Sequence, residues 1–299
     1  MSWQVTGSFI GGPLCLLAFI MMLLKHKPKI QIKDKIVLIT GATSGLGKAC
    51  AVKFVKAGCR VILAGRSIEK LKEVQKELID TIKSEFTPEI VVLDLEDDQS
   101  ILTAIETAYS FYNKIDILIN NAGVSYRGTI QDTEIDVHRK IMQVNYFGQL
   151  ILTKGIVSRM KKDGGGHIVG ISSIQGIISI PYRSAYSASK HAFQAFCDCV
   201  RAEYCDDKIR VSVISPGYMQ TNLSLNAMTS DGSQYGVMDK TTESGMKPEY
   251  VAQQVLNAII YDKNEVKLAS LGPKLGCFLR TLAPNVFFWK MNSRAREQK

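Results

Sequence analysis

The sequence predicts an α/β fold in which helices cover both faces of one mostly parallel sheet. Short apolar runs alternate along the chain with longer stretches whose apolar residues recur every three or four positions. The short runs are apolar on both faces, which is typical of strands buried between two layers of helices. With 299 residues, of which 46% are hydrophobic, the chain is long enough to fill one large core.

Taken in order, the short runs predict seven strands. A glycine-rich loop and a helix that ends near Ala57 follow the first strand. An amphipathic helix from Ile68 to Ile82 follows the second, and a helix from Pro248 to about Ile260 precedes the last. The predicted strands are Ile36–Thr40, Arg60–Ala64, Glu89–Leu93, Asp116–Ile119, His167–Ser172, Arg210–Ile214 and Glu265–Leu268.

The segment from Asn222 to Met246 is polar and irregular. A loop of this length inside a compact domain commonly has a function. We expect it to form a flexible lid at the mouth of a substrate site, with a solvated excursion as the alternative.

The first 24 residues carry no charged side chain, and Val5–Leu24 forms an apolar run that Gly11, Gly12 and Pro13 weaken. About 20 residues of helix span a bilayer core. A cleaved signal peptide would have a basic start and a small-residue cleavage site, and neither is present. We therefore expect residues 1–30 to be a transmembrane anchor with a basic flank. The lysines that follow favour a cytosolic catalytic domain, residues 31–270, and the lumenal orientation stays open.

The C-terminal tail, residues 271–299, is apolar and basic, and it contains Phe287, Phe288 and Trp289 beside Lys290. Prolines interrupt it, so it is too broken to span a membrane, but aromatic residues beside lysine suit a membrane interface. Packing in the core or in a dimer is the alternative. The formal net charge of +9 lies largely in this tail and behind the apolar N-terminal segment, so we do not expect nucleic-acid binding.

Seven cysteines and four histidines show no metal-ligand spacing, so no metal site is predicted. The cysteines fit reduced thiols packed as small apolar side chains.

Tyr186 and Lys190 are four residues apart in a predicted helix, so they lie on one face. An ammonium beside a phenol favours the phenolate and lowers the pKa of the tyrosine. A tyrosine tuned in this way can donate and accept a proton near neutral pH. The spacing alone is common on helix surfaces, so its meaning depends on the rest of the chain.

The loop Thr40–Gly47 connects the first predicted strand to the first predicted helix. Glycines at such a junction let the backbone approach a pyrophosphate at a helix N-terminus. At the end of the second strand stands Arg66, where an acidic residue would bind the ribose diol of NAD. A guanidinium favours a 2′-phosphate, so NADP(H) is preferred and NAD(H) remains possible.

Together these motifs resemble the short-chain dehydrogenases/reductases, and most closely their member-seven, 7B-like branch. The branch resemblance lies in Ser125–Thr129, Ile171–Gly176 and Arg280–Pro284. The family implies a doubly wound Rossmann-like three-layer sandwich. The motifs that carry the family resemblance are Thr40–Gly47, Asn120–Gly123, Asn145, Ser173, Tyr186 with Lys190, and Pro216 with Gly217.

The resemblance implies a role for each motif. Tyr186 would be the general acid and base, Lys190 would lower its pKa and bind the nicotinamide ribose, and Ser173 would bind the substrate oxygen. Asn145 would hold a water that connects Lys190 to solvent. The implied cofactor-binding residues are Gly41, Ser44, Gly45, Leu46, Gly47, Arg66, Asp94, Asn121, Ala122, Gly123, Tyr186, Lys190, Pro216 and Thr221.

The expected function is the NADP(H)-dependent interconversion of a carbonyl and an alcohol on a lipophilic substrate such as a retinoid, a steroid or a long-chain lipid ketone. One alternative is a dinucleotide-binding regulator or scaffold with little catalysis, and another is a reductase of a small soluble carbonyl. The expected location is the endoplasmic reticulum membrane, with the peroxisomal membrane as the alternative. A homodimer is expected by analogy with the family.

Overall fold

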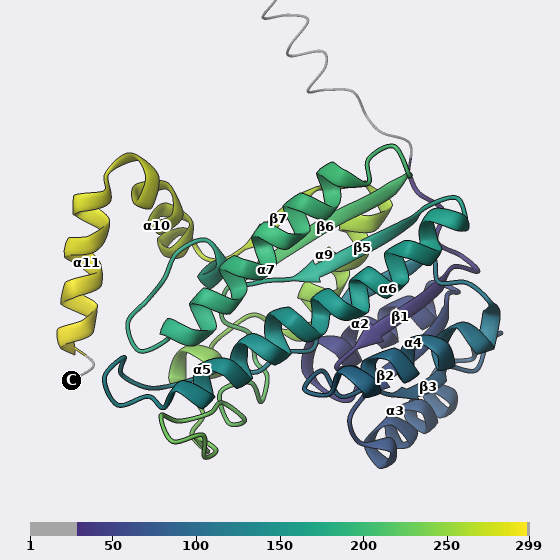
Figure 1. Cartoon of the computed structure of the whole chain (residues 1–299), viewed down its shortest axis with the longest axis horizontal. Helices are drawn as coiled ribbons and strands as arrows, with labels where there is room; N and C mark the ends of the chain where they lie inside the picture. The colour runs from purple at the N-terminus through teal and green to yellow at the C-terminus, as the bar shows by residue number, and fades with distance from the viewer. Residues whose placement is uncertain (1–28, 298–299) are drawn as a thin grey trace, which may run out of the picture.

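The computed structural model describes residues 29–297, and seven parallel strands form one sheet at its centre (Figure 1). The order across the sheet is β3-β2-β1-β4-β5-β6-β7. The strands are β1 (Ile36–Thr40), β2 (Arg60–Gly65), β3 (Glu89–Val92), β4 (Ile117–Asn120), β5 (Gly166–Ile171), β6 (Ile209–Pro216) and β7 (Glu265–Leu268).

The sheet is doubly wound, because the chain builds outward from β1 to β3 and then returns to place β4 on the other side of β1. Side chains of each strand alternate between two cores. On β1, Val37 and Ile39 pack toward α2, α3 and α9, whereas Ile36 and Leu38 pack toward α4, α6 and α7. The predicted three-layer sandwich with a seven-stranded parallel sheet is therefore confirmed, and its strands lie within two residues of the predicted bounds.

Two layers of helices cover the sheet (Figure 1). The first layer is α2 (Gly45–Lys56), α3 (Ile68–Thr81) and α9 (Pro248–Ile260), and the second is α4 (Asp98–Tyr112), α6 (Gly148–Lys162) and α7 (Ser184–Glu203). Ahead of α6 lie α5 (Ile135–Met142) and a π-helical turn, η1 (Gln143–Phe147), which continues directly into α6. A 3-10 turn, η2 (Ile174–Gly176), follows β5.

The C-terminal tail forms two helices, α10 (Leu271–Leu282) and α11 (Pro284–Glu297), which stand at one end of the molecule (Figure 1). Pro284 opens α11, where a missing backbone N–H costs nothing. Phe287 is buried against Ile174 and Ile178 of the catalytic domain. One side of the tail thus packs on the domain.

The irregular segment that the sequence analysis expects to be a lid contains one short helix, α8 (Lys240–Glu243). The Met228 N–H donates to the Ser125 carbonyl, and the Arg127 N–H donates to the Met228 carbonyl. Ser224 and Thr242 are buried. The segment is therefore fixed to the body by backbone hydrogen bonds.

Within residues 29–297 no helix is long and apolar enough to cross a membrane. The predicted anchor, residues 1–30, lies almost wholly outside the described residues, so it stays a prediction.

Candidate active site

Tyr186 and Lys190 lie in the first turns of α7 and are both buried, at 7% and 4% exposure. The Lys190 ammonium donates to the Ile171 carbonyl at the end of β5, at 2.9 Å. It lies 5.9 Å from the centre of the Tyr186 ring. The predicted shared face is therefore confirmed, and it points to the carboxyl ends of the central strands.

Ser173 follows β5 and faces the same place. Its hydroxyl accepts a hydrogen bond from the Gln175 N–H at 3.1 Å and donates one to the Pro216 carbonyl at 3.4 Å. The Ser173 side chain is also one of the groups that oppose the rise in the pKa of Tyr186 and so favour its phenolate. The two hydroxyls therefore converge on a position that a substrate oxygen could occupy.

The pKa of Tyr186 responds to burial and to several nearby groups. Burial raises this pKa above its ordinary value, and the Ser173 side chain and the charges of Arg127 and Arg183 oppose the rise. The Lys190 ammonium donates to the Ile171 carbonyl and lies 5.9 Å from the centre of the Tyr186 ring. Burial lowers the pKa of Lys190 itself to about 8. Arg127 and Arg183 thus add positive charge near Tyr186 that the sequence analysis did not anticipate, and the role of Lys190 in lowering the tyrosine pKa stays a prediction.

Asn145 lies in the π-helical turn between α5 and α6, a distortion that is frequent at functional sites. Its amide donates to the Val124 carbonyl at 2.9 Å and to the Ser189 hydroxyl at 3.0 Å. A Cβ on Gly123 would lie 3.0 Å from the Asn145 oxygen and 3.5 Å from the Lys190 ammonium. Asn145 and Lys190 thus both lie close to Gly123. The water that Asn145 is expected to hold stays a prediction.

The glycine loop between β1 and α2 has the geometry of an anion site. Gly41 and Gly45 have φ values of +65° and +51°, which L side chains rarely adopt. A Cβ on Gly47 would lie 2.1 Å from the Gly41 carbonyl oxygen. Only glycine keeps this loop closed over the N-terminus of α2, where free N–H groups and the helix dipole favour a phosphate.

The loop is tied to the neighbouring strand β4. The Thr40 hydroxyl accepts from the N–H groups of Asn121 and Ala122, both at 2.9 Å. The Asn121 amide donates to the Thr40 carbonyl at 2.9 Å. This junction lies where the order of strands reverses, which is the usual ligand position in doubly wound sheets.

The remaining predicted cofactor residues surround this junction. Ser44 precedes α2 without a side-chain capping bond, and Leu46 is buried in the first turn. Thr221 packs over the loop, since a Cβ on Gly45 would lie 3.2 Å from its methyl group. Arg66 and Asp94 follow β2 and β3, and the Arg66 guanidinium is 65% exposed and 3.5 Å from Glu96. These positions agree with a dinucleotide that runs along the carboxyl edge of the sheet.

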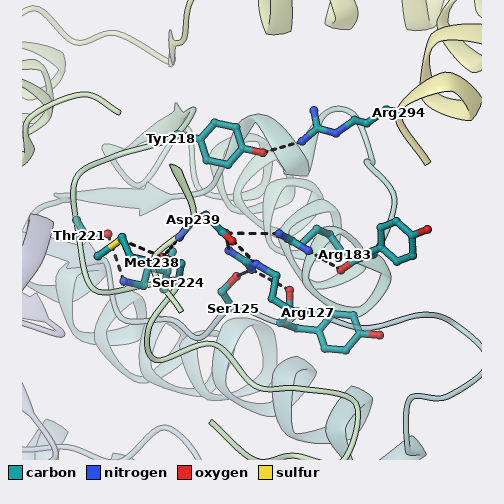
Figure 2. Close-up of polar contacts among 12 residues, drawn as sticks. Ser125, Arg127, Arg183, Tyr218, Thr221, Ser224, Met238, Asp239 and Arg294 are labelled. Atoms are coloured by element: carbon teal, nitrogen blue, oxygen red, sulfur yellow. Dashed lines mark hydrogen bonds and ion pairs between the residues drawn. The ribbon is translucent and has the colours of Figure 1, made fainter. Parts of the chain in front are cut away.

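A half-buried ion network beside Tyr186 was not predicted from the sequence. Arg127 donates to Asp239 from Nε at 3.0 Å and from Nη2 at 2.5 Å, and Arg183 lies 3.6 Å from the same carboxylate (Figure 2). Burial and the charge of Arg127 lower the pKa of Arg183 to about 10. Asp239 belongs to the expected lid segment, so this carboxylate holds that segment against two arginines of the body.

Tyr186 and Ser173 line a cavity of about 470 Å³. The tail forms much of its wall, and the residues of the expected lid segment that line it include Leu223, Ser224 and Thr242. Arg294 of α11 also lines it and donates to the Tyr218 hydroxyl at 3.0 Å (Figure 2). The apolar part of the lining includes Ile174, Ile178, Ile180, Met219, Leu223, Leu275, Leu279, Phe287 and Met291.

A doubly wound sheet with this loop and this set of tyrosine, lysine, serine and asparagine defines a dehydrogenase or reductase. Residues 35–231 match the family model described as short chain dehydrogenase. The chain belongs to this family and is an oxidoreductase.

Curated relatives place the chain near one branch of the family. It is 52% identical over 271 residues to dehydrogenase/reductase SDR family member 7B of Xenopus tropicalis, which covers 90% of this chain and 88% of the relative. It is 48% identical over 291 residues to the protein of the same name from Rattus norvegicus, which covers 96% of this chain and 90% of the relative. The predicted 7B-like branch is confirmed.

Solved structures agree with the fold. A short-chain dehydrogenase from Streptomyces avermitilis has a TM-score of 0.74 at 28% identity, over 87% of this chain and 97% of the other. A short chain dehydrogenase/reductase from Burkholderia phymatum, solved in complex with NAD, has a TM-score of 0.76 at 20% identity, over 86% and 96% of the two chains. An alcohol dehydrogenase from Thermococcus sibiricus, complexed with 5-hydroxy-NADP, has a TM-score of 0.69 at 22% identity, over 80% and 97%.

Proposed function

We propose that the protein is a membrane-anchored, NADP(H)-dependent oxidoreductase that interconverts a carbonyl and an alcohol on a lipophilic substrate. The observation that supports the substrate class is the largely apolar cavity that Tyr186 and Ser173 help to line. A polar end with two hydroxyls suits a single oxygen, and the apolar wall suits a hydrocarbon body. Retinoid, steroid and long-chain lipid ketones all meet this description.

In this proposal one site residue transfers the proton and another stabilises the negative charge on the substrate oxygen. Tyr186 donates the proton to the carbonyl oxygen in reduction and accepts it from the alcohol in oxidation. Ser173 donates a hydrogen bond that stabilises negative charge on that oxygen. The glycine loop and the α2 N-terminus fit the pyrophosphate of a dinucleotide, and Lys190 fits its nicotinamide ribose. When bound, the nicotinamide cofactor supplies or receives the hydride.

The second candidate function is a regulator or scaffold that binds dinucleotide with little turnover, and the third is a reductase of a small soluble carbonyl. The buried, mutually oriented Tyr186, Ser173 and Lys190 favour catalysis over the regulator. The size and apolar lining of the cavity favour a lipophilic substrate over a small soluble one.

Steady-state turnover with NADPH tests the proposal. The full chain in detergent or vesicles is offered retinoid, steroid and long-chain ketones and, for comparison, small soluble carbonyls. We expect kcat/KM to rise with the apolar surface of the substrate. A highest kcat/KM for a small soluble carbonyl would support the third candidate. Dinucleotide binding without turnover on any carbonyl would support the regulator.

The proposed cofactor preference depends on Arg66, which is held beside Glu96. Replacing Arg66 with glutamine is expected to lower kcat/KM for NADPH about tenfold while that for NADH changes little, because an exposed charge-assisted bond to the 2′-phosphate is lost. Glu96→Gln is the matched variant, and it should improve NADPH use because it removes a carboxylate near the phosphate. An equal loss with both cofactors in Arg66→Gln would contradict this assignment.

The position of Arg183 predicts a pH effect. The positive charge of Arg183 favours the Tyr186 phenolate, so Arg183→Gln is expected to raise the pKa of Tyr186. Alcohol oxidation needs the deprotonated tyrosine, so its rate rises with pH as the tyrosine loses its proton. In Arg183→Gln this rise should therefore occur at higher pH. The pH profile of kcat/KM with an alcohol and NADP⁺ measures this shift. Arg201→Gln, which removes a partly exposed arginine near the C-terminal end of the same helix, should leave the profile in place.

We further propose the endoplasmic reticulum membrane as the location, with a cytosolic catalytic domain. The lumenal orientation and the peroxisomal membrane are the alternatives. The support is the apolar N-terminal run and the lysines behind it. A homodimer is proposed from the family alone.

A further inference from the structure

The outer face of α10 carries a continuous apolar stripe. Leu271, Leu275, Phe278 and Leu282 follow one another at spacings of four, three and four residues, so they lie on one side of the helix. Their exposed fractions are 86%, 55%, 61% and 64%. The other side of α10 faces the cavity through Gly276 and Leu279. An exposed apolar stripe of this kind is typical of a helix that meets a partner surface.

Helix α11 extends this surface. Val286, Phe288 and Trp289 are exposed, at 51%, 47% and 70%. The inner side of α11 is held to the body, because Phe287 is buried and the Tyr182 hydroxyl donates to the Ala295 carbonyl at 3.0 Å. The apolar outer surface is therefore presented by helices that the catalytic domain fixes in place.

The charge of the two helices selects the kind of partner. Their only acidic residue is Glu297, at the last position of α11. A second copy of the chain docking through the same patch would bring identical cations together, because a two-fold interface pairs a surface with itself. A bilayer with anionic headgroups accepts both the apolar stripe and the cations. The basic residues are Lys274, Arg280, Lys290, Arg294 and Arg296, of which Lys290 and Arg294 line the cavity.

We propose that the outer face of α10 and α11 docks on an anionic lipid bilayer and that the substrate enters the cavity from that bilayer between these helices. Gly272, Pro273 and Leu275 line the cavity from the first turn of α10, and Leu271 and Leu275 belong to the stripe. The cavity wall and the docking face thus adjoin on one helix and share Leu275. Trp289 beside Lys290 suits the headgroup level of the bilayer. The entry route rests on the proposed function, whereas the docking does not.

Trp289 provides a direct probe, since the only other tryptophan in the sequence is Trp3. Full-length Trp3→Phe protein is mixed with vesicles of phosphatidylcholine and phosphatidylserine whose acyl chains carry bromine. We expect a blue shift and the loss of about half of the Trp289 emission, because docking brings the indole to the acyl boundary. The loss should be smaller without phosphatidylserine and in Lys274→Gln/Arg280→Gln protein.

Variants separate docking from folding and from chemistry. Phe278→Asp/Leu282→Asp places charge on the stripe at positions that do not line the cavity, and it should abolish the quenching. Ile130→Asp/Ile135→Asp alters two apolar residues with similar exposure outside the tail, and Trp289 in this variant should still be quenched by brominated lipid. The stripe variant should also lose turnover on a ketone carried in vesicles but keep turnover on one dissolved in water.

The other outcomes overturn the proposal. Trp289 that stays accessible to acrylamide and unaffected by brominated lipid would show that the face does not meet the bilayer. Protection of Trp289 that increases with protein concentration in the absence of lipid would show that a second copy covers it. If brominated lipid quenches Trp289 in the protein with an intact stripe, but the stripe variant turns over vesicle-borne ketone equally fast, the entry route alone is overturned. Absence of turnover on every carbonyl would count against the proposed function and leave the docking result intact.

Discussion

Replacing Tyr186 with phenylalanine is expected to lower turnover by about 10²–10⁴-fold, the usual contribution of a positioned general acid or base. The change removes one oxygen from a buried ring on α7 and leaves the packing of the ring in place. Lys190 keeps its bond to the Ile171 carbonyl, and the glycine loop is not touched. Dinucleotide affinity should therefore stay near that of the unaltered protein while kcat falls.

The measurement is NADPH consumption with the best ketone of the panel, together with NADPH affinity by fluorescence. Tyr109→Phe is a matched control, because the Tyr109 hydroxyl is buried with no hydrogen-bond partner within residues 29–297 and lies on α4, away from the cavity. It should keep full turnover. Retention of normal turnover by Tyr186→Phe would show that another group transfers the proton.

Local patterns predicted most of the fold. Each strand is a short run that is apolar on both faces, and runs of this kind can be recognised without knowing what packs against them. The final strand, Glu265–Leu268, and helix α9 agree with their predicted bounds. The shared face of Tyr186 and Lys190 also follows from local geometry, since residues four apart on a helix are neighbours.

Contacts between distant segments could not be predicted in this way. Arg127 and Asp239 are 112 residues apart, and both lie in irregular segments that follow no period. The position of the tail over the cavity depends on the packing of Phe287 against Ile174 and Ile178, which are more than 100 residues earlier in the chain. The pKa of Tyr186 also depends on burial and on two arginines from different parts of the chain, which the spacing of Tyr186 and Lys190 does not show.

Replacing Gly47 with alanine is expected to cost the protein at least tenfold in dinucleotide affinity, or about 1.4 kcal/mol. The new Cβ would lie 2.1 Å from the Gly41 carbonyl oxygen and 2.6 Å from the Asn121 amide nitrogen. A backbone carbonyl cannot move aside as the end of a long side chain can. The start of α2 must therefore shift away from the loop, and the N–H groups that would hold the pyrophosphate lose their alignment.

Calorimetric titration with NADP⁺ and thermal unfolding measure the two consequences of Gly47→Ala. Unfolding should show a loss of about 1–3 kcal/mol, as for other overpacked sites. Gly272→Ala serves as the control for dinucleotide affinity, because nothing lies within 4 Å of its added Cβ. If Gly47→Ala bound NADP⁺ as tightly as the unaltered protein, the loop between β1 and α2 could not be the pyrophosphate site. The convergence of Gly41, Thr40 and Asn121 on that loop would then serve only to join β1 to β4.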